Sequence, residues 1–369
     1  MNVEIEGNGI IYKKAREMET YHYTINKIED KEILLKMEYS SVCGSDLHTY
    51  LGHRSFNGPT MIGHEGVGRI LALGDRINLD SFGNKIETGD LILFQPYIWC
   101  NHCEYCASSK FTFCLNRTSV GSFSHIDGNL PRGTFSQHLV LPEGSQFIKI
   151  KDNEISLYAL SPVNCALATV MRAFEDFSGN VLGKRVLILG AGALGIYASS
   201  IADSMGAKEI YVMDKNIERL KLSEKYGATG TFTSIEELAN DSKSKNIDGI
   251  ADIALNLSGY PPLALDAIKL MKRTGRFIEI GTIFSAEING LDLANLVVRG
   301  VNITGFRTYE IRHLRDAYDF IVSNKYNYDF VTLVKVNHSL TDINNAFEDA
   351  LKGEQVRQGI RNVLGDDKN

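Results

Sequence analysis

The sequence lacks the features that mark membrane and nucleic-acid-binding proteins. It contains no run of about 18 or more apolar residues, which a membrane-spanning helix requires. Its 39 lysine and arginine residues are outnumbered by 45 acidic residues, so the formal net charge is −6 at pH 7. This balance argues against nucleic acid or an anionic membrane as a partner. The opening segment MNVEIEGNGIIYKK has no apolar signal region. We therefore expect a cytoplasmic protein with a small-molecule partner.

Proline and cysteine are also scarce, with seven and six residues in a chain of 369, whereas glycine occurs 33 times. This balance predicts many tight turns and no long disordered linker. A composition of 44% hydrophobic and 23% charged residues is typical of a globular protein. The length is sufficient for two domains with separate cores.

The first 150 residues favour a mostly β domain. Short apolar or alternating segments are separated by glycine, and few helical repeats of useful length occur. The expected strands are 21–28, 32–39, 67–73, 90–94, 136–141 and 146–150.

A glycine turn after a buried strand predicts a coenzyme site. Residues 186–189 are continuously apolar, as expected of a parallel strand buried on both faces. They run into Gly190-Ala191-Gly192-Ala193-Leu194-Gly195, then a helical stretch, then a strand at 209–213 that ends at Asp214. Strand, glycine turn, helix, strand and acid at this spacing are typical of dinucleotide-binding domains.

Each of these residues has a separate physical role in that prediction. Gly190 permits the tight turn, Gly192 lets the backbone approach a pyrophosphate, and Gly195 allows close packing of helix and strand. The helix N-terminus offers N–H groups to the phosphates. Asp214 would accept hydrogen bonds from the ribose hydroxyls and would repel a 2′-phosphate, so NAD is the expected coenzyme.

The alternation of strands and helices continues to about residue 305. It predicts a doubly wound parallel sheet. The expected strands are 249–256, 275–280 and 301–305, and the expected helices are 263–272 and 292–298. After residue 305 we expect helices at 311–323 and 342–351 and a last strand at 359–363.

Four of the six cysteines form one cluster, CNHCEYCASSKFTFC, with Cys100, Cys103, Cys106 and Cys114 spaced C-x2-C-x2-C-x7-C. Four thiolates can close a tetrahedron around a structural zinc ion. An iron–sulfur cluster also takes four cysteines, but the bacterial ferredoxin spacing has a shorter last interval followed by proline.

The glycine-rich stretch from Cys43 to Gly68 holds the candidate chemistry, and its first part, with Ser45 and His48, is expected to form a loop. Cys43 and His64 are zinc ligands by type, and a catalytic zinc needs three protein ligands with one position open. Cys165 is the one cysteine left to supply the third ligand.

The glycine motif, the four-cysteine loop and the Gly63-His64-Glu65 segment together resemble the zinc-dependent alcohol dehydrogenases of the medium-chain dehydrogenase/reductase superfamily. The resemblance extends over nearly the whole chain. Cys43-Gly44-Ser45-Asp46 is similar to the family's Cys-Gly-(Ser/Thr)-Asp. Cys165 stands where the family has its third ligand, which is Cys in the alcohol dehydrogenase branch and Glu in the polyol and threonine dehydrogenase branches.

The resemblance also implies an architecture. A GroES-like, mostly β catalytic domain would comprise 1–162 and 307–369, with a structural zinc lobe at about 96–116. A Rossmann-type NAD-binding domain would comprise 163–306. It further implies that Thr169 lies beside the nicotinamide, Arg219 near the adenosine ribose and Arg361 at the pyrophosphate. We further expect the protein to bind two zinc ions per chain and to form a homodimer or homotetramer.

Four side chains near the ligands have expected roles in catalysis. Ser45 could take the hydroxyl proton of an alcohol and pass it to His48, whose reference pKa of about 6.5 suits release to solvent. Asp46 is the candidate acceptor that orients His64. Glu65 is expected to act electrostatically near the metal or to contact it. Five further basic residues could mark a polar substrate pocket, but we favour the interpretation that they are solvated loop charges: His53, Arg54, Arg117, Arg307 and Arg312.

The sequence therefore predicts a zinc-dependent oxidoreductase that transfers a hydride between an alcohol and NAD. The alcohol is expected to be secondary, of the polyol or sugar-like kind. A primary alcohol or aldehyde reductase is the alternative within the same superfamily. Outside it, the alternative is a catalytically inactive NAD-binding sensor or scaffold protein, which would carry at most the structural zinc.

Overall fold

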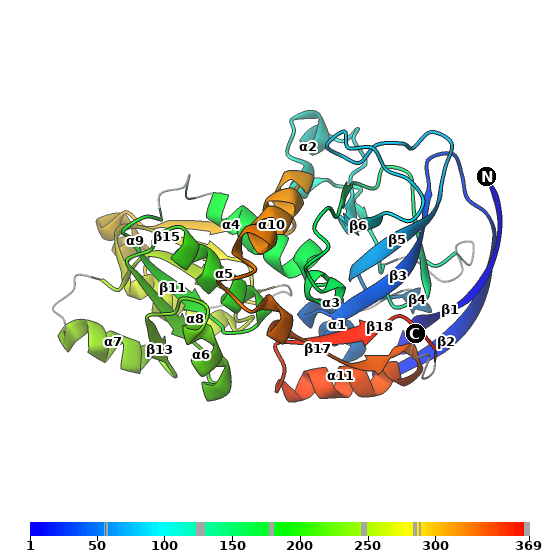
Figure 1. Cartoon of the computed structure of the whole chain (residues 1–369). Coiled ribbons are helices and arrows are strands. Elements are labelled where there is room, and N and C mark those ends of the chain that lie inside the picture. Colours follow the sequence, from blue (N-terminus) through cyan, green and yellow to red (C-terminus); the bar gives the residue numbers. More distant parts are fainter. Residues whose placement is uncertain are drawn as a thin grey trace. The chain divides into compact units, whose positions relative to one another are not determined.

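The protein forms two compact units in a computed structural model (Figure 1). The structure describes residues 1–54, 56, 58–122, 130–175, 177, 181–244, 249–282, 286–287 and 289–364. The first unit is Met1–Ala168 with Thr308–Asn369, and the second is Thr169–Arg307. The boundaries expected from the sequence were 162/163 and 306/307. In the structure, residues 163–168 belong to the first unit and Arg307 belongs to the second.

The first unit is built on antiparallel sheets. A three-stranded sheet joins β1 (Asn2–Lys14), β2 (Glu17–Lys27) and β4 (Thr60–Met61). The larger sheet has the order β10 (Phe147–Lys149), β6 (Leu91–Phe94), β5 (Glu65–Leu73), β3 (Ile33–Val42), β18 (Arg357–Arg361) and β17 (Val334–Ser339), with β9 (His138–Leu141) also paired to β3. The strands β7 (Tyr97–Ile98) and β8 (Thr118–Ser119) form a separate two-stranded sheet.

The end of the chain thus returns to the first unit and inserts into its sheet. β18 pairs with β3 antiparallel and with β17 parallel. Helix α11 (Ile343–Lys352) covers this region, and its Phe347 packs against Phe135 with ring centroids 5.6 Å apart. Alternating apolar residues of the strands and the apolar stripe of α11 therefore form one core.

The other helices of the first unit are short, apart from α10 (Ile311–Asn324). They are α1 (Gly44–Tyr50), α2 (Glu104–Ala107) and α3 (Leu157–Leu160), with 3₁₀ turns at Phe111–Phe113, Phe330–Leu333 and Leu340–Asp342 and a π-helical turn at Val163–Leu167. The continuous helical stretch Leu157–Glu175 is long and apolar enough to cross a membrane, but 72% of it is buried inside the protein. Its apolarity therefore reflects a place in the core.

The second unit contains a six-stranded parallel sheet in the order β13 (Gly230–Phe232), β12 (Glu209–Met213), β11 (Arg185–Leu189), β14 (Ala251–Asn256), β15 (Met271–Glu279) and β16 (Asn302–Gly305). The described helices are α4 (Ala168–Glu175), α5 (Ala193–Ser204), α6 (Ile217–Glu224), α7 (Ile235–Ser244), α8 (Pro261–Lys269) and α9 (Leu293–Arg299). The strand order reverses at β11, where doubly wound sheets bind their ligands.

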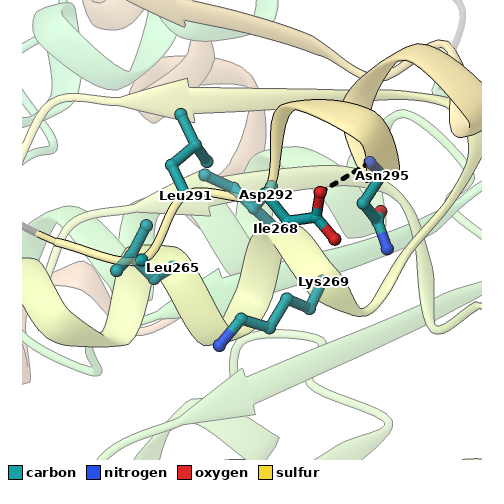
Figure 2. A pocket seen from close by; sticks show the side chains of 7 residues that line it. Leu265, Ile268, Lys269, Leu291, Asp292 and Asn295 are labelled. Atoms are coloured by element: carbon teal, nitrogen blue, oxygen red, sulfur yellow. Dashed lines mark hydrogen bonds between the residues drawn. The ribbon is translucent and has the colours of Figure 1, made fainter.

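Figure 2 shows a small pocket of this unit between α8 and the start of α9. Leu265 and Ile268 of α8 line it together with Leu291. Asp292 caps α9 by accepting a hydrogen bond from the N–H of Asn295 at 3.1 Å. The pocket is too small for a coenzyme.

Three expectations about the elements were wrong. The helix expected at 263–272 ends at Lys269, because Met271 already begins β15 and pairs with Ala251. The last strand was expected at 359–363 but spans Arg357–Arg361. The segment after Cys43, expected to be a glycine-rich loop, is helix α1, because Asp46 caps it by accepting a hydrogen bond from the N–H of Cys43 at 3.0 Å.

Candidate functional site

Three elements of the first unit bring Cys43, His64 and Cys165 together. Cys43 follows β3 as the N-cap of α1, His64 precedes β5, and Cys165 lies in the π-helical turn. The two sulfur atoms are 3.9 Å apart, and Cys165 Sγ is 3.5 Å from His64 Nε2. With a carboxylate oxygen of Glu65, the possible ligand atoms all lie within 4.8 Å of one another.

These distances fit a tetrahedral zinc ion. Zinc–sulfur bonds of about 2.3 Å and zinc–nitrogen bonds of about 2.0–2.1 Å place two sulfurs about 3.8 Å apart and sulfur and nitrogen about 3.6 Å apart. The observed 3.9 Å and 3.5 Å match both values. Two thiolates and one imidazole would hold the ion and leave one position for a substrate oxygen or water.

Asp46 fixes the orientation of the imidazole. Its Oδ1 atom lies 3.2 Å from His64 Nδ1, while Oδ2 accepts the hydrogen bond from the N–H of Cys43. The Nδ1–H group therefore donates to Asp46, and the lone pair of Nε2 faces the two sulfurs. The sequence left open whether Asp46 orients a ligand or caps a helix, and in the structure its two oxygens do both.

Glu65 is held by partners on two other strands. Ser41 Oγ donates to Oε2 at 2.5 Å, and Arg357 Nη2 donates to Oε1 at 2.9 Å. Glu65 and Ser41 are fully buried, and Arg357 is 7% exposed. Both carboxylate oxygens are thus engaged in this arrangement. The expected role of Glu65, electrostatic or in contact with the metal, stays a prediction.

Arg357 and Ser41 are contributors that the sequence did not predict. The candidate arginine near the C-terminus was Arg361, but Arg361 is exposed at the end of β18, whereas Arg357 points into the buried site. Strand alternation could not show which of the two arginines is buried beside Glu65, because they are four residues apart and lie on the same face of an extended strand.

The buried charges change the acidity of the metal-binding groups. Hydrogen bonding to Cys165 holds the pKa of Cys43 well below its usual range, and the same contact raises the pKa of Cys165. Burial raises the pKa of Glu65 to about 8, although the Arg357 guanidinium opposes this. A bound cation would favour the ionised form of both cysteines.

Ser45 and His48 lie on α1. Ser45 Oγ is 3.5 Å from His64 Nε2, so its hydroxyl borders the position that a metal would occupy. His48 is one turn further along the helix, where residues three apart share a face. Its Nδ1 atom is 3.1 Å from Nδ1 of His53. Burial first, then the charges of His53 and Arg54, lower the pKa of His48.

The basic residues considered for a substrate pocket have local partners. Arg54 lies over the ring of Phe56, Arg117 over Tyr97, and Arg312 donates to Glu310 at 3.2 Å. The carbonyl of Arg307 accepts a hydrogen bond from Arg172 in the second unit. His53, the fifth of these residues, contacts His48. Contacts of this kind order surface loops. The described contacts do not gather the five into one cluster.

The four-cysteine loop forms a second cluster in the first unit. The sulfurs of Cys100, Cys103, Cys106 and Cys114 lie within 4.8 Å of one another. Cys100 Sγ is 3.5 Å from that of Cys114 and 4.0 Å from that of Cys106, close to the sulfur–sulfur spacing of about 3.8 Å in a tetrahedral zinc site. The backbone N–H of His102 lowers the pKa of Cys100 to about 5. Burial raises the pKa of Cys106 to about 12, and a bound cation would favour the ionised form of all four cysteines, as a closed zinc site requires.

We expect Cys103→Ser to release the metal of this loop and to lower the melting temperature. Little apolar surface holds the loop, whose core consists mainly of Trp99 and the cysteines, and structural zinc contributes directly to folding free energy. Metal analysis and calorimetry check the result. Glu104→Gln, an exposed neighbour in the same loop, is the matched control. Unchanged metal content and melting temperature in Cys103→Ser would contradict the assignment.

The glycine turn of the second unit has the geometry that a dinucleotide needs. Gly190 has φ of +102°, and a Cβ atom on Gly195 would lie 1.8 Å from the carbonyl oxygen of Gly190. A Cβ on Gly192 would meet no protein atom within 4 Å. The first and last glycines are therefore required by the turn itself. The middle glycine and Leu194 border space that a ligand can occupy at the N-terminus of α5.

Asp214 connects the end of β12 to this turn. Its Oδ2 atom accepts a hydrogen bond from the N–H of Ala191 at 2.7 Å. Arg219 is half-buried on α6, and Thr169 is 8% exposed on α4 in the same unit. Arg361 lies in the first unit, so its expected role at the pyrophosphate stays a prediction.

Two family models match parts of this chain. A family model described as the alcohol dehydrogenase GroES-like domain matches residues 29–152, and one described as zinc-binding dehydrogenase matches residues 193–323, together more than half of the chain. An L-threonine 3-dehydrogenase from Salmonella paratyphi B is 28% identical over 340 residues, which are 89% of this chain and 91% of the relative.

Solved structures have the same fold. An alcohol dehydrogenase from Thermotoga maritima superposes with a TM-score of 0.90 at 26% identity, over 97% of this chain and 99% of the other. A zinc-binding dehydrogenase from Sinorhizobium meliloti, bound to NADP, has a TM-score of 0.82 at 19% identity over 97% and 99% of the two chains. The predicted fold, a GroES-like domain with a Rossmann-type domain, is confirmed. The chain belongs to the zinc-dependent alcohol dehydrogenases of the medium-chain dehydrogenase/reductase superfamily and is an oxidoreductase that acts on alcohols.

Proposed function

We propose that the protein oxidises a secondary alcohol of the polyol or sugar-like kind with NAD and binds two zinc ions per chain. The observation that carries the proposal is the tetrahedral spacing of Cys43, His64 and Cys165, with the Ser45 hydroxyl beside the fourth position. The four-cysteine loop would hold the second zinc ion. Asp214 supports the choice of NAD.

The residues of the chain have distinct tasks in this reaction. When bound at the three ligands, zinc acts as a Lewis acid that lowers the pKa of the substrate hydroxyl. Ser45 accepts the hydroxyl proton, and His48 carries it to solvent, helped by a lowered pKa that keeps the ring neutral at neutral pH. Asp46 keeps His64 oriented, and Arg357 balances the charge of Glu65 beneath the site.

A secondary alcohol is supported by the relative from Salmonella, because the 3-hydroxyl of threonine is a secondary alcohol. A screen of alcohols, polyols and sugars would test the proposal through NAD reduction, read at roughly 340 nm where the reduced nicotinamide absorbs. Turnover of secondary alcohols well above that of primary ones is the expected result. A preference for primary alcohols would contradict it.

We expect Asp214→Ser to narrow the preference for NAD over NADP. Asp214 lies at the carboxyl end of β12, hydrogen-bonded to the glycine turn, and its charge repels a 2′-phosphate. Removing one charge at contact distance should change the ratio of kcat/KM values by about tenfold or more. Asp266→Ser, which removes a surface charge paired with Lys269, is the control. Comparable kcat/KM for both coenzymes in the unmodified protein would refute the NAD preference.

We also propose a cytoplasmic homo-oligomer, with the outer edge of the second unit as the contact. Within α9, all of whose residues the structure describes, none is buried, and Val297 and Val298 are 81% and 69% exposed. The neighbouring strand β16 ends the sheet, and all four of its residues are exposed. Such an apolar helix beside an open strand edge is typical of a surface that pairs with another chain.

We expect Val297→Asp to reduce the assembly to single chains, because a buried unpaired carboxylate is costly at an interface. Light scattering coupled to size-exclusion chromatography measures the mass. Leu182→Asp, in the same unit and also exposed at 74%, should leave the mass unchanged. A single-chain mass for the unmodified protein would overturn the proposal.

A further inference from the structure

Asn164 precedes Cys165 in the π-helical turn and is fully buried. Its side-chain nitrogen donates to the carbonyl of His64 at 3.2 Å and to the carbonyl of Phe94 at 3.0 Å. Its side-chain oxygen accepts a hydrogen bond from the N–H of Gly66 at 3.3 Å. Both amide hydrogens and the oxygen are thus satisfied, as the burial of a polar group requires.

Two of these bonds contact the backbone of the ligand segment, at His64 itself and at Gly66. The third reaches Phe94, the last residue of β6. The amide therefore ties the turn that carries Cys165 to the strand that begins after His64. The two segments that this amide connects carry two of the proposed ligands, and the sulfur of Cys165 lies 3.5 Å from Nε2 of His64.

Tyr309 fixes the same residue from another direction. Its hydroxyl donates to the main-chain carbonyl of Asn164, and its side chain is fully buried. The ring packs edge-on against Tyr97, with centroids 5.7 Å apart. The carbonyl of a π-helical turn lacks the regular helical pattern of partners, so this hydroxyl helps to keep the turn in place.

We infer that Asn164 is a positioning residue for the catalytic metal: it sets the spacing between Cys165 and His64 and thereby slows loss of the ion. This inference rests on the proposed function, in which Cys43, His64 and Cys165 bind zinc. Asn164 does not contact the ion. It acts through the backbone of the two ligands, as supporting groups around metal sites commonly do.

The test is the rate of zinc release to an excess of a chromogenic chelator. The unmodified protein should release two zinc ions in separate phases, one from each cluster. Asn164→Ala should speed the phase of the catalytic ion by about 10–100-fold, the range for loss of a group that supports a metal ligand. The phase of the four-cysteine loop should not change. The phases are assigned with Cys103→Ser, which lacks the loop ion.

Asn362→Ala is the matched control for loss of a buried amide. Asn362 is 3% exposed in the same unit, donates to the carbonyls of Thr134 and Ser136 and accepts a hydrogen bond from Ser40 Oγ. These bonds involve none of the three proposed ligands. This variant should lower the melting temperature but leave the catalytic phase unchanged. If both variants speed that phase equally, the effect is general destabilisation and the inference is wrong.

Tyr309→Phe provides a second test that removes a single oxygen atom and keeps the aromatic packing. It should speed the catalytic phase severalfold and alter the visible spectrum of the cobalt-substituted protein, which reports ligand geometry at the metal. Unchanged release and an unchanged spectrum in Tyr309→Phe and in Asn164→Ala would overturn the inference. An unmodified protein that holds zinc only in the four-cysteine loop would instead refute the proposed function itself, and the inference with it.

Discussion

Cys43→Ser is expected to fold, to keep the zinc ion of the four-cysteine loop and to lose alcohol oxidation almost completely. Cys43 Sγ lies 3.9 Å from Cys165 Sγ, and this contact lowers the pKa of Cys43, which favours the thiolate form that zinc binds. A serine hydroxyl is a far weaker ligand for zinc than a thiolate. Lewis-acid stabilisation contributes several kcal/mol to the transition state, so we expect kcat/KM to fall by about 10³-fold or more.

Metal analysis and steady-state kinetics measure this result, with circular dichroism as the check on folding. Cys103→Ser is the reciprocal control, because it should lose the other zinc ion and show its main defect in stability. Two zinc ions bound per chain in Cys43→Ser, or turnover within tenfold of the unmodified protein, would exclude Cys43 as a ligand of the catalytic ion.

Ser45→Ala should abolish most alcohol oxidation while leaving both zinc ions and NAD binding intact. The Ser45 hydroxyl lies 3.5 Å from His64 Nε2, at the edge of the position where a substrate hydroxyl would bind. General acid–base groups contribute roughly 10²–10⁴-fold, and we expect a loss in the upper part of that range. Ser45→Thr, which keeps the hydroxyl, is the matched control. Near-normal turnover by Ser45→Ala, with hydride transfer rate-limiting, would show that the proton leaves by another route.

His48→Gln should cost less, because water can replace the ring at the solvent end of the path. The pKa of His48 is lowered, by burial first and then by His53 and Arg54. A lowered pKa keeps the ring neutral, and able to accept a proton, at pH values below the ordinary histidine range. Solvent accepts the proton more readily at higher pH, so the defect of His48→Gln should shrink as pH rises, and added imidazole should reduce it further. A defect that is independent of pH and of imidazole would contradict this role.

Local chemistry is the part of the site that the sequence could predict. The cysteine spacing at Cys100–Cys114 and the glycine turn at Gly190–Gly195 each depend on a few neighbouring residues, so their structure follows from the segment itself. Asp46 is an intermediate case, because one oxygen makes a local contact as a helix cap and the other contacts a histidine eighteen positions away. Strand 209–213 was placed correctly, because its apolar run ends sharply at an acid.

Long-range pairing explains what could not be predicted. Arg357 contacts Glu65 across 292 positions of sequence, and no local pattern distinguishes it from Arg361. Asn164 reaches His64 across 100 positions. Helix α1 was mistaken for a loop because Gly44 and the polar residues after it have low intrinsic helix propensity. Tertiary packing of Tyr50 against Phe347, with ring centroids 5.0 Å apart, supports the helix instead.

The place of β18 in the first unit has a consequence for how the chain matures. This strand lies between β3 and β17, inside the sheet, and it supplies the arginine that neutralises the buried carboxylate of Glu65. The second unit is one continuous segment, Thr169–Arg307, and can fold while synthesis continues. The first unit keeps an open sheet until β18 has left the ribosome. Until then Glu65 lacks the Arg357 guanidinium beside it, and β3 exposes an edge that other chains could pair with. The residues Cys43, His64 and Cys165 are thus all made well before the strand that completes their surroundings, which makes the partly synthesised chain most dependent on chaperones in that interval.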